Sequence, residues 1–175
     1  MSIYKRTALF TLAAWLAACA PTAPVARFGL GQTPSAAQIR GWDIDVRADG
    51  AGLPAGAGSV AQGQAIYQAR CLACHGEQGE KGIAPRLAGG QGTLATKAPV
   101  LTVGSYWPYA TTLYDYIHRA MPLDSPQSLT PSEVYAVTAY TLHLNGIVKA
   151  DAVLDAAALA AIRMPNRDGF RPVLK

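Results

Sequence analysis

The chain has 175 residues and a formal net charge of +4 at pH 7. Lys5 and Arg6 supply two of these charges from an N-terminal leader, which leaves +2, and no run of Lys and Arg with interleaved aromatic residues follows. This balance excludes a nucleic-acid-binding protein, and the length suits one domain with extensions.

Residues 1–18 have the pattern of a secretory signal peptide, with an apolar run too short to span a bilayer as a stable helix. Residues 16–19, "LAAC", resemble the lipobox of bacterial lipoproteins. This resemblance implies that Cys19 becomes the lipid-modified first residue of the mature chain, and that acyl chains alone hold it on a membrane. The alternative is cleavage after Ala20, which gives a secreted soluble chain beginning at Pro21.

Residues 19–58 are rich in Pro, Gly and Ala, a composition typical of an extended tether. Within them, residues 41–50 alternate the apolar side chains of Trp42, Ile44 and Val46 with charged ones. The alternation predicts a short strand-like segment with one apolar face. That face either packs on the chain's own domain or docks on a partner.

Helix signals begin at Ser59. Ser59 and Gln62 form a capping-box sequence, which predicts a helix that runs on to the cysteines. Gly63 and Tyr67 lie one turn apart on this helix. We expect the glycine to let another helix approach closely and the tyrosine ring to pack on it.

The predicted helix leads into "CLACH", residues 71–75. A structural zinc site needs four ligands, and the chain has no second Cys pair to supply them. A thioredoxin-like dithiol would follow a strand rather than a helix. The motif therefore predicts one c-type haem, joined covalently to Cys71 and Cys74, with His75 as the first axial ligand; a redox or partial metal site is the alternative.

Further residues are candidates to complete the haem site. The second ring nitrogen of His75 needs a hydrogen-bond acceptor, for which the carbonyl of Pro85 is the candidate. Tyr106 and Trp107 are candidates to donate hydrogen bonds to a haem propionate. The pool of apolar residues that could wall the haem comprises Leu72, Ile83, Leu87, Leu101, Val103, Tyr106, Trp107, Leu113, Tyr116, Ile117 and Val137.

Residues 111–120 predict a one-faced helix, because Leu113, Tyr116, Ile117 and Ala120 recur at helical spacing. It should end at Met121, which precedes Pro122 and is therefore held extended.

Met121 is the preferred second axial ligand, since a thioether ligand raises the reduction potential of a haem. Met164 is the other candidate, and either methionine could instead fill the core. His118 would be the ligand if Met121 is not, although its position opposite the apolar stripe favours a surface histidine.

The last long helix is predicted to begin with Thr130 as N-cap, Pro131 at the first helical position and Glu133 closing a capping box. It should stop at Asn145-Gly146. We therefore expect an all-α domain over residues 59–147. Residues 148–175 form a C-terminal extension that either packs on this domain or offers basic side chains to an acidic partner.

The order of these features over residues 59–146 resembles a class I c-type cytochrome, a small all-α fold around one covalently attached haem, here with extended N- and C-terminal arms. The segments "GWDIDVRADGAGLP", "VGSYWPYATTLYDYIHRAMP" and "LNGI...MPNRDGF" are similar to the cytochrome subunits of bacterial sulfite dehydrogenases and sulfane-sulfur dehydrogenases. Some members of that family carry two haems, whereas this chain has one C-x-x-C-H motif.

The resemblance implies a periplasmic electron carrier, not itself an enzyme, that accepts electrons from a molybdenum-cofactor dehydrogenase subunit and passes them to a downstream cytochrome or oxidase. Two alternatives remain open. One is a free-standing carrier for another dehydrogenase or an oxidase. The other is a haem enzyme or sensor, which needs an open iron position.

Overall fold

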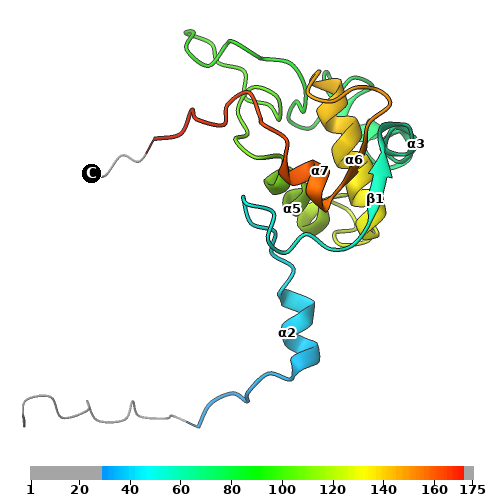
Figure 1. Ribbon diagram of the computed structural model, residues 1–175, viewed down its shortest axis with the longest axis vertical. Coiled ribbons are helices and arrows are strands. Elements are labelled where there is room, and N and C mark those ends of the chain that lie inside the picture. Colours follow the sequence, from blue (N-terminus) through cyan, green and yellow to red (C-terminus); the bar gives the residue numbers. More distant parts are fainter. Residues whose placement is uncertain (1–28, 172–175) are drawn as a thin grey trace, which may run out of the picture. The chain divides into compact units, whose positions relative to one another are not determined.

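The computed structural model describes residues 29–171. The signal peptide, the lipid attachment at Cys19 and the start of the predicted tether lie outside these residues. All described helices and strands belong to one compact unit, Ala36–Lys175, and most are labelled in Figure 1. In chain order they are α2 (Ala36–Trp42), β1 (Ala57–Ser59), α3 (Val60–Arg70), α4 (Leu72–His75), α5 (Ala110–Ala120), α6 (Pro131–Leu144), β2 (Val153–Asp155) and α7 (Ala156–Ala160).

The crossing of α3 and α6 is built on the glycine that the sequence singled out. Gly63 lies against Ala136 of α6, where a Cβ on the glycine would overlap the Ala136 carbonyl. One turn on, the rings of Tyr67 and Tyr140 pack with centroids 5.2 Å apart. The predicted capping boxes are present at both helices, with Ser59 and Gln62 at α3 and Thr130 and Glu133 at α6. The close approach is confirmed.

Helix α5 packs its buried face on α6, where the rings of Tyr114 and Tyr135 lie with centroids 4.5 Å apart. The buried positions Ala110, Leu113, Tyr114 and Ile117 have the predicted helical period. Tyr116 does not lie on this buried face, so that prediction is wrong. Its side chain is 48% exposed and meets the edge of Trp107 instead, because Tyr114 occupies the position toward α6.

The fold is mostly helical, as predicted, with one small sheet that the sequence did not indicate. In it β1 and β2 pair antiparallel, with Ala57 opposite Asp155 and Ser59 opposite Val153. Each strand has only three residues, too few to give a recognisable alternation. The pairing fastens the chain after α6 to the residue that caps α3.

No strand forms over residues 41–50, so that prediction is wrong. Trp42 ends α2 with 86% of its side chain exposed, and the chain then turns toward α5. Val46 is buried in the core, and its N–H donates to Asp115 Oδ1 at 2.8 Å. Hydrogen bonds to α5 rather than a strand partner satisfy this backbone, and the apolar residue Val46 packs on the chain's own domain.

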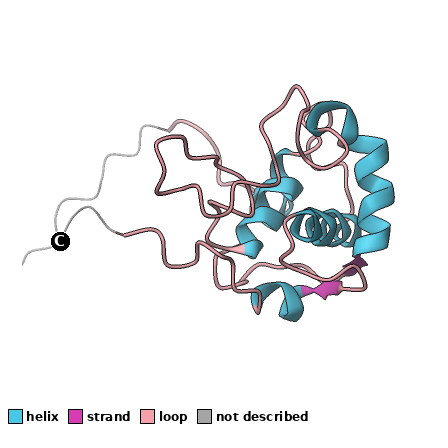
Figure 2. Cartoon of the chain, turned by 90° about the horizontal axis from the view of Figure 1, so that it is seen from above, coloured by secondary structure: helices cyan, strands magenta, loops and turns pink. Residues whose placement is uncertain are grey.

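Loops make up the part of the domain between α4 and α5, where residues 76–109 contain no helix or strand (Figure 2). Among residues 29–171, none of the helices has the length and hydropathy needed to cross a bilayer.

Candidate haem site

Cys71 lies between α3 and the single helical turn α4, and Cys74 lies within that turn. The N–H of Cys71 donates to the Tyr67 carbonyl at 2.8 Å, and the N–H of His75 donates to the Cys71 carbonyl at 2.9 Å. Both cysteines are free thiols; Cys71 is half-buried and Cys74 is exposed. Burial raises the pKa of the Cys71 thiol to about 11. A redox-active dithiol needs a lowered thiol pKa, so this environment does not favour that alternative.

The imidazole of His75 is held by the loop that follows it. Its Nδ1 lies 3.1 Å from the carbonyl oxygen of Pro85, the hydrogen bond that the sequence predicted. A carbonyl can only accept, so Nδ1 carries the proton and Nε2 keeps its lone pair. The hydrogen bond therefore leaves His75 in the tautomer that can ligate a metal through Nε2.

Hydrogen bonds hold the turn after His75 against α3 and against the C-x-x-C-H motif. Tyr67 donates its hydroxyl proton to the Gly76 carbonyl at 2.8 Å, and the N–H of Ala84 donates to the Cys74 carbonyl at 2.9 Å. Gly76 has a φ of +76°, and a Cβ there would overlap the Glu80 carbonyl. The loop that presents Pro85 can return toward His75 only with glycine at this position.

Asn145 contributes to the site in a way that sequence reasoning missed. Its Nδ2 donates to the Leu87 carbonyl at 3.0 Å and to the Thr141 carbonyl at 2.9 Å. The N–H of Val103 donates to the same Leu87 carbonyl at 3.2 Å. The end of α6 thus joins the loop that holds His75 to residues 101–109. The sequence identified Asn145 only as a helix cap, and nothing local distinguishes the second role.

The two candidate methionines lie in different environments. Met121 follows α5 directly with extended backbone, φ −122° and ψ 143°, and its side chain is partly buried. Met164 is only 1% exposed and belongs to the hydrophobic core. The thioether of Met164 is therefore enclosed by protein, whereas that of Met121 is at the edge of the core.

His118 is half-buried rather than on the surface, which corrects the sequence expectation. Its ring centroid lies 5.9 Å from that of Tyr114, and its Nδ1 is buried without a hydrogen-bond partner.

Tyr106 and Trp107 lie on the last part of the long loop, just before α5. Trp107 is partly buried and meets Tyr116 edge to face with ring centroids 5.7 Å apart. Tyr106 is exposed and its ring centroid is 5.1 Å from that of Phe170. Their predicted contact with a propionate stays a prediction.

The chemistry of this part of the chain fits a haem. It offers two thiols for thioether bonds, an imidazole nitrogen with a fixed tautomer and an accessible thioether. Several apolar residues expected to wall the haem are left exposed by the polypeptide, among them Ile83 at 91% and Leu101 at 55%. Exposed apolar side chains of this kind are what an apolar cofactor would cover. Within residues 29–171 there is no group of three or more His, Cys, Asp or Glu side chains that could hold a metal ion.

Comparison with known proteins agrees with this chemistry. Residues 60–145 match the family model of cytochrome c. The chain is also similar to a chain in the crystal structure of the sulfane dehydrogenase SoxCD from Paracoccus pantotrophus, with 44% sequence identity and a TM-score of 0.78. That similarity covers 83% of this chain and 72% of the other.

The chain belongs to the cytochrome c family. Members of the family bind haem c covalently, and Cys71 and Cys74 of this cytochrome fit that attachment. The cytochrome is therefore an electron carrier with a mostly helical class I fold. A search of curated proteins gives no match.

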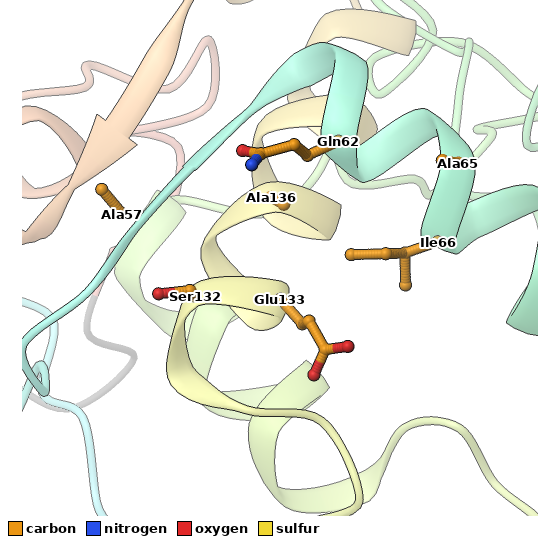
Figure 3. A pocket seen from close by; sticks show the side chains of 7 residues that line it. All are labelled: Ala57, Gln62, Ala65, Ile66, Ser132, Glu133 and Ala136. Carbon is orange, nitrogen blue, oxygen red and sulfur yellow. The ribbon is translucent and has the colours of Figure 1, made fainter.

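A pocket of about 280 Å³ lies elsewhere on the cytochrome, between β1, α3 and the start of α6 (Figure 3). It is lined by Ala57, Gln62, Ala65, Ile66, Ser132, Glu133 and Ala136. Glu133 and Gln62 are already engaged in the capping boxes of their helices, and no candidate haem residue lines the pocket.

Proposed function

We propose that this cytochrome is the electron-accepting subunit of a periplasmic, molybdenum-dependent dehydrogenase that oxidises a sulfur compound. The observation that carries the proposal is the 44% identity to a chain of the sulfane dehydrogenase SoxCD, which covers 83% of this chain. The family model matches only residues 60–145, so the similarity to SoxCD extends beyond the haem domain. A similarity that includes the arms supports a shared assembly more than the haem domain alone would.

The candidate residues have distinct roles in this proposal. Cys71 and Cys74 would hold the haem through thioether bonds, and His75 Nε2 and Met121 Sδ would be the atoms that bind its iron. Pro85 fixes the ring plane of His75 through the 3.1 Å hydrogen bond. Tyr106 and Trp107 would donate hydrogen bonds to the haem propionates. The haem supplies the Fe(III)/Fe(II) couple, and the protein sets its potential and access.

The surface around the cysteines suits brief contact with a redox partner. Cys74 and Ala73 are exposed, so a haem bonded to Cys74 would have this edge close to the protein surface. Redox pairs typically use small interfaces that form and separate quickly. This edge is the proposed point of electron entry from the catalytic subunit and of exit to a downstream cytochrome or oxidase.

Location is part of the proposal. A signal peptide over residues 1–18 with a lipobox ending at Cys19 supports export to the periplasm and attachment through lipid alone. Cleavage after Ala20 would give a soluble periplasmic carrier instead.

The test is whether the proposed molybdenum subunit reduces the purified holocytochrome. The two proteins are coexpressed, affinity-purified through the molybdenum subunit, and mixed in separate arms with sulfite and with a sulfane-sulfur donor. We expect copurification in a fixed ratio and rapid reduction of the haem in one arm.

Absence of copurification and no faster reduction than that of an unrelated c-type cytochrome would contradict the proposal and favour a free-standing carrier. Fast binding of carbon monoxide by the unmodified holocytochrome would favour an open iron site.

A further inference from the structure

We propose that residues 164–170, here named the C-terminal strap, position the loop of residues 106–109, which carries the candidate propionate donors Tyr106 and Trp107, and thereby raise the reduction potential of the haem. The inference rests on the proposed haem site but not on the proposed molybdenum partner. The strap lies outside the family match, which ends at residue 145.

The strap is fixed to the domain at its first residue. Met164 is fully buried in the hydrophobic core, and its carbonyl accepts from the N–H of Arg167 at 3.1 Å. The N–H of Gly169 donates in turn to the Asn166 carbonyl at 3.1 Å. The side chains that follow Met164 are therefore presented from an anchored turn.

Three side chains of the strap contact the loop of residues 106–109. Asn166 Nδ2 donates to the Tyr106 carbonyl at 2.6 Å, and the guanidinium carbon of Arg167 lies 4.2 Å from the centre of the Tyr109 ring. Phe170 packs against the Tyr106 ring. In Figure 1 the strap is the red segment near the C-terminal end, and these contacts join it to the green loop.

The loop of residues 106–109 is continuous with the rest of the site. Tyr106 donates its N–H to the Thr102 carbonyl at 3.0 Å, and neighbouring Val103 donates to the Leu87 carbonyl at 3.2 Å. Leu87 lies two residues after Pro85, the acceptor of the His75 hydrogen bond. The strap thus supports both the candidate propionate donors and the segment that orients the axial histidine. These connections are made through backbone groups. A looser loop would therefore disturb both the candidate propionate donors and the segment that orients His75.

The physical consequence is a change of potential. A looser loop admits water to the haem surroundings, and a more polar environment stabilises the charge of the ferric state. Loss of a strap contact should therefore lower the reduction potential. Loss of the Asn166 side chain should also lower the potential, although this change removes no charge.

The test uses the holocytochrome with the substitutions Asn166→Ala and Arg167→Gln. Arg163→Gln is the charge-matched control, because Arg163 is an exposed cation immediately before the strap, and its partner is Asp168 rather than one of the strap side chains that contact the loop. Both test variants should speed amide hydrogen exchange of Val103 and Tyr106 by about three- to tenfold, the size expected for one lost hydrogen bond or cation–π contact. Both should also lower the potential, while Arg163→Gln leaves exchange and potential at their wild-type values.

Substitution of the aromatic partner gives a second check. Tyr109→Phe keeps the ring under Arg167 and should retain the wild-type potential, whereas Tyr109→Leu should behave like Arg167→Gln. Faster exchange without a change of potential would overturn the inference. An equal fall of potential in Arg163→Gln would also overturn it, because charge rather than positioning would then be the cause. Failure of the molybdenum subunit to reduce the wild-type protein would contradict only the proposed partner.

Discussion

Two methionines could ligate the haem, and their burial distinguishes them at the level of single residues. Met121 lies at the edge of the core directly after α5, whereas Met164 is 1% exposed within it. We expect Met121→Leu to abolish the near-infrared charge-transfer band of methionine-ligated ferric haem and to lower the reduction potential. Absorption spectroscopy and voltammetry of the holocytochrome measure both.

The matched control is Met164→Leu, which keeps the volume of a core side chain. It should cost less than about 1.5 kcal/mol in the free energy of unfolding and leave the band and the potential unchanged. A band that survives in Met121→Leu and disappears in Met164→Leu would reverse the assignment. Retention of the band in both variants would mean that neither methionine is the ligand.

Among the helices, the crossing of α3 and α6 depends on Gly63. A Cβ at this position would overlap the Ala136 carbonyl and lie 2.8 Å from Tyr140 Cβ. Alanine favours a helix over glycine by about 0.5–1 kcal/mol, but overpacking a core contact costs about 1–3 kcal/mol. Gly63→Ala should therefore lower the free energy of unfolding by about 1–2 kcal/mol, and the melting temperature by about 2–4 °C for each kcal/mol. Calorimetry of the holocytochrome measures the shift.

Gly41 of α2 supplies the control for this prediction, since a Cβ there would meet nothing within 4 Å. Gly41→Ala should not lower the melting temperature, because it adds a better helix former without a clash. If Gly63→Ala proved as stable as the wild type, α3 and α6 could not be as close as the structure has them.

Helix α5 is tied to the segment before β1 through Asp115. Its carboxylate accepts from the Val46 N–H and from Arg119 at 2.8 and 2.9 Å. Partial burial alone would raise the pKa of Asp115, but these hydrogen bonds outweigh it and hold the pKa below its ordinary value of 3.8. Asp115→Ala should lower the free energy of unfolding at pH 7 by about 1–3 kcal/mol, because the N–H of buried Val46 loses its acceptor.

The pH dependence follows from the direction of that shift. A depressed carboxyl pKa stabilises the fold above the ordinary value and loses this effect as the pH falls through the folded-state pKa. The difference between wild type and Asp115→Ala should thus shrink below about pH 4. Denaturant titrations from pH 3 to pH 7 measure it, with exposed Asp124→Ala as the control. A difference that stays constant down to pH 3 would show that the charge of Asp115 contributes nothing.

Over the whole molecule, what could be predicted from the sequence depends on how far apart the interacting residues are. Ser59 caps α3 together with Gln62, which lies three positions further on. The carbonyl of Pro85 accepts a hydrogen bond from His75, which is ten positions earlier in the chain. Such contacts follow from helix geometry and short loops. Asn145 and Leu87 are 58 positions apart, and Asn166 and Tyr106 are 60 apart. Contacts of that range depend on how α6 and the C-terminal extension pack, which neither local spacing nor side-chain type reveals.

The wrong prediction of a strand over residues 41–50 has the same physical cause. Trp42 and Val46 occupy alternate positions with Ile44, but Trp42 ends a helix and Val46 lies in an irregular segment, where its N–H donates to α5. A period of two over so few residues does not fix a strand when a distant side chain satisfies the backbone. The helical period of α5 extends over more residues and correctly predicts that Leu113 and Ile117 are buried, but it misplaces Tyr116 and His118.

Attachment to a membrane concerns the molecule as a whole and depends on Cys19. Acyl chains contribute about 0.8 kcal/mol per buried methylene, so a lipidated Cys19 would keep the domain on the membrane surface although no described helix crosses it. We expect the wild-type protein, expressed with a clickable fatty-acid analogue, to carry the label and to partition into detergent. Cys19→Ser should be unlabelled and should retain residues 1–18. Mass spectrometry of the N-terminal peptide reads both results, and an unlabelled wild-type chain that begins at Pro21 would contradict lipid attachment.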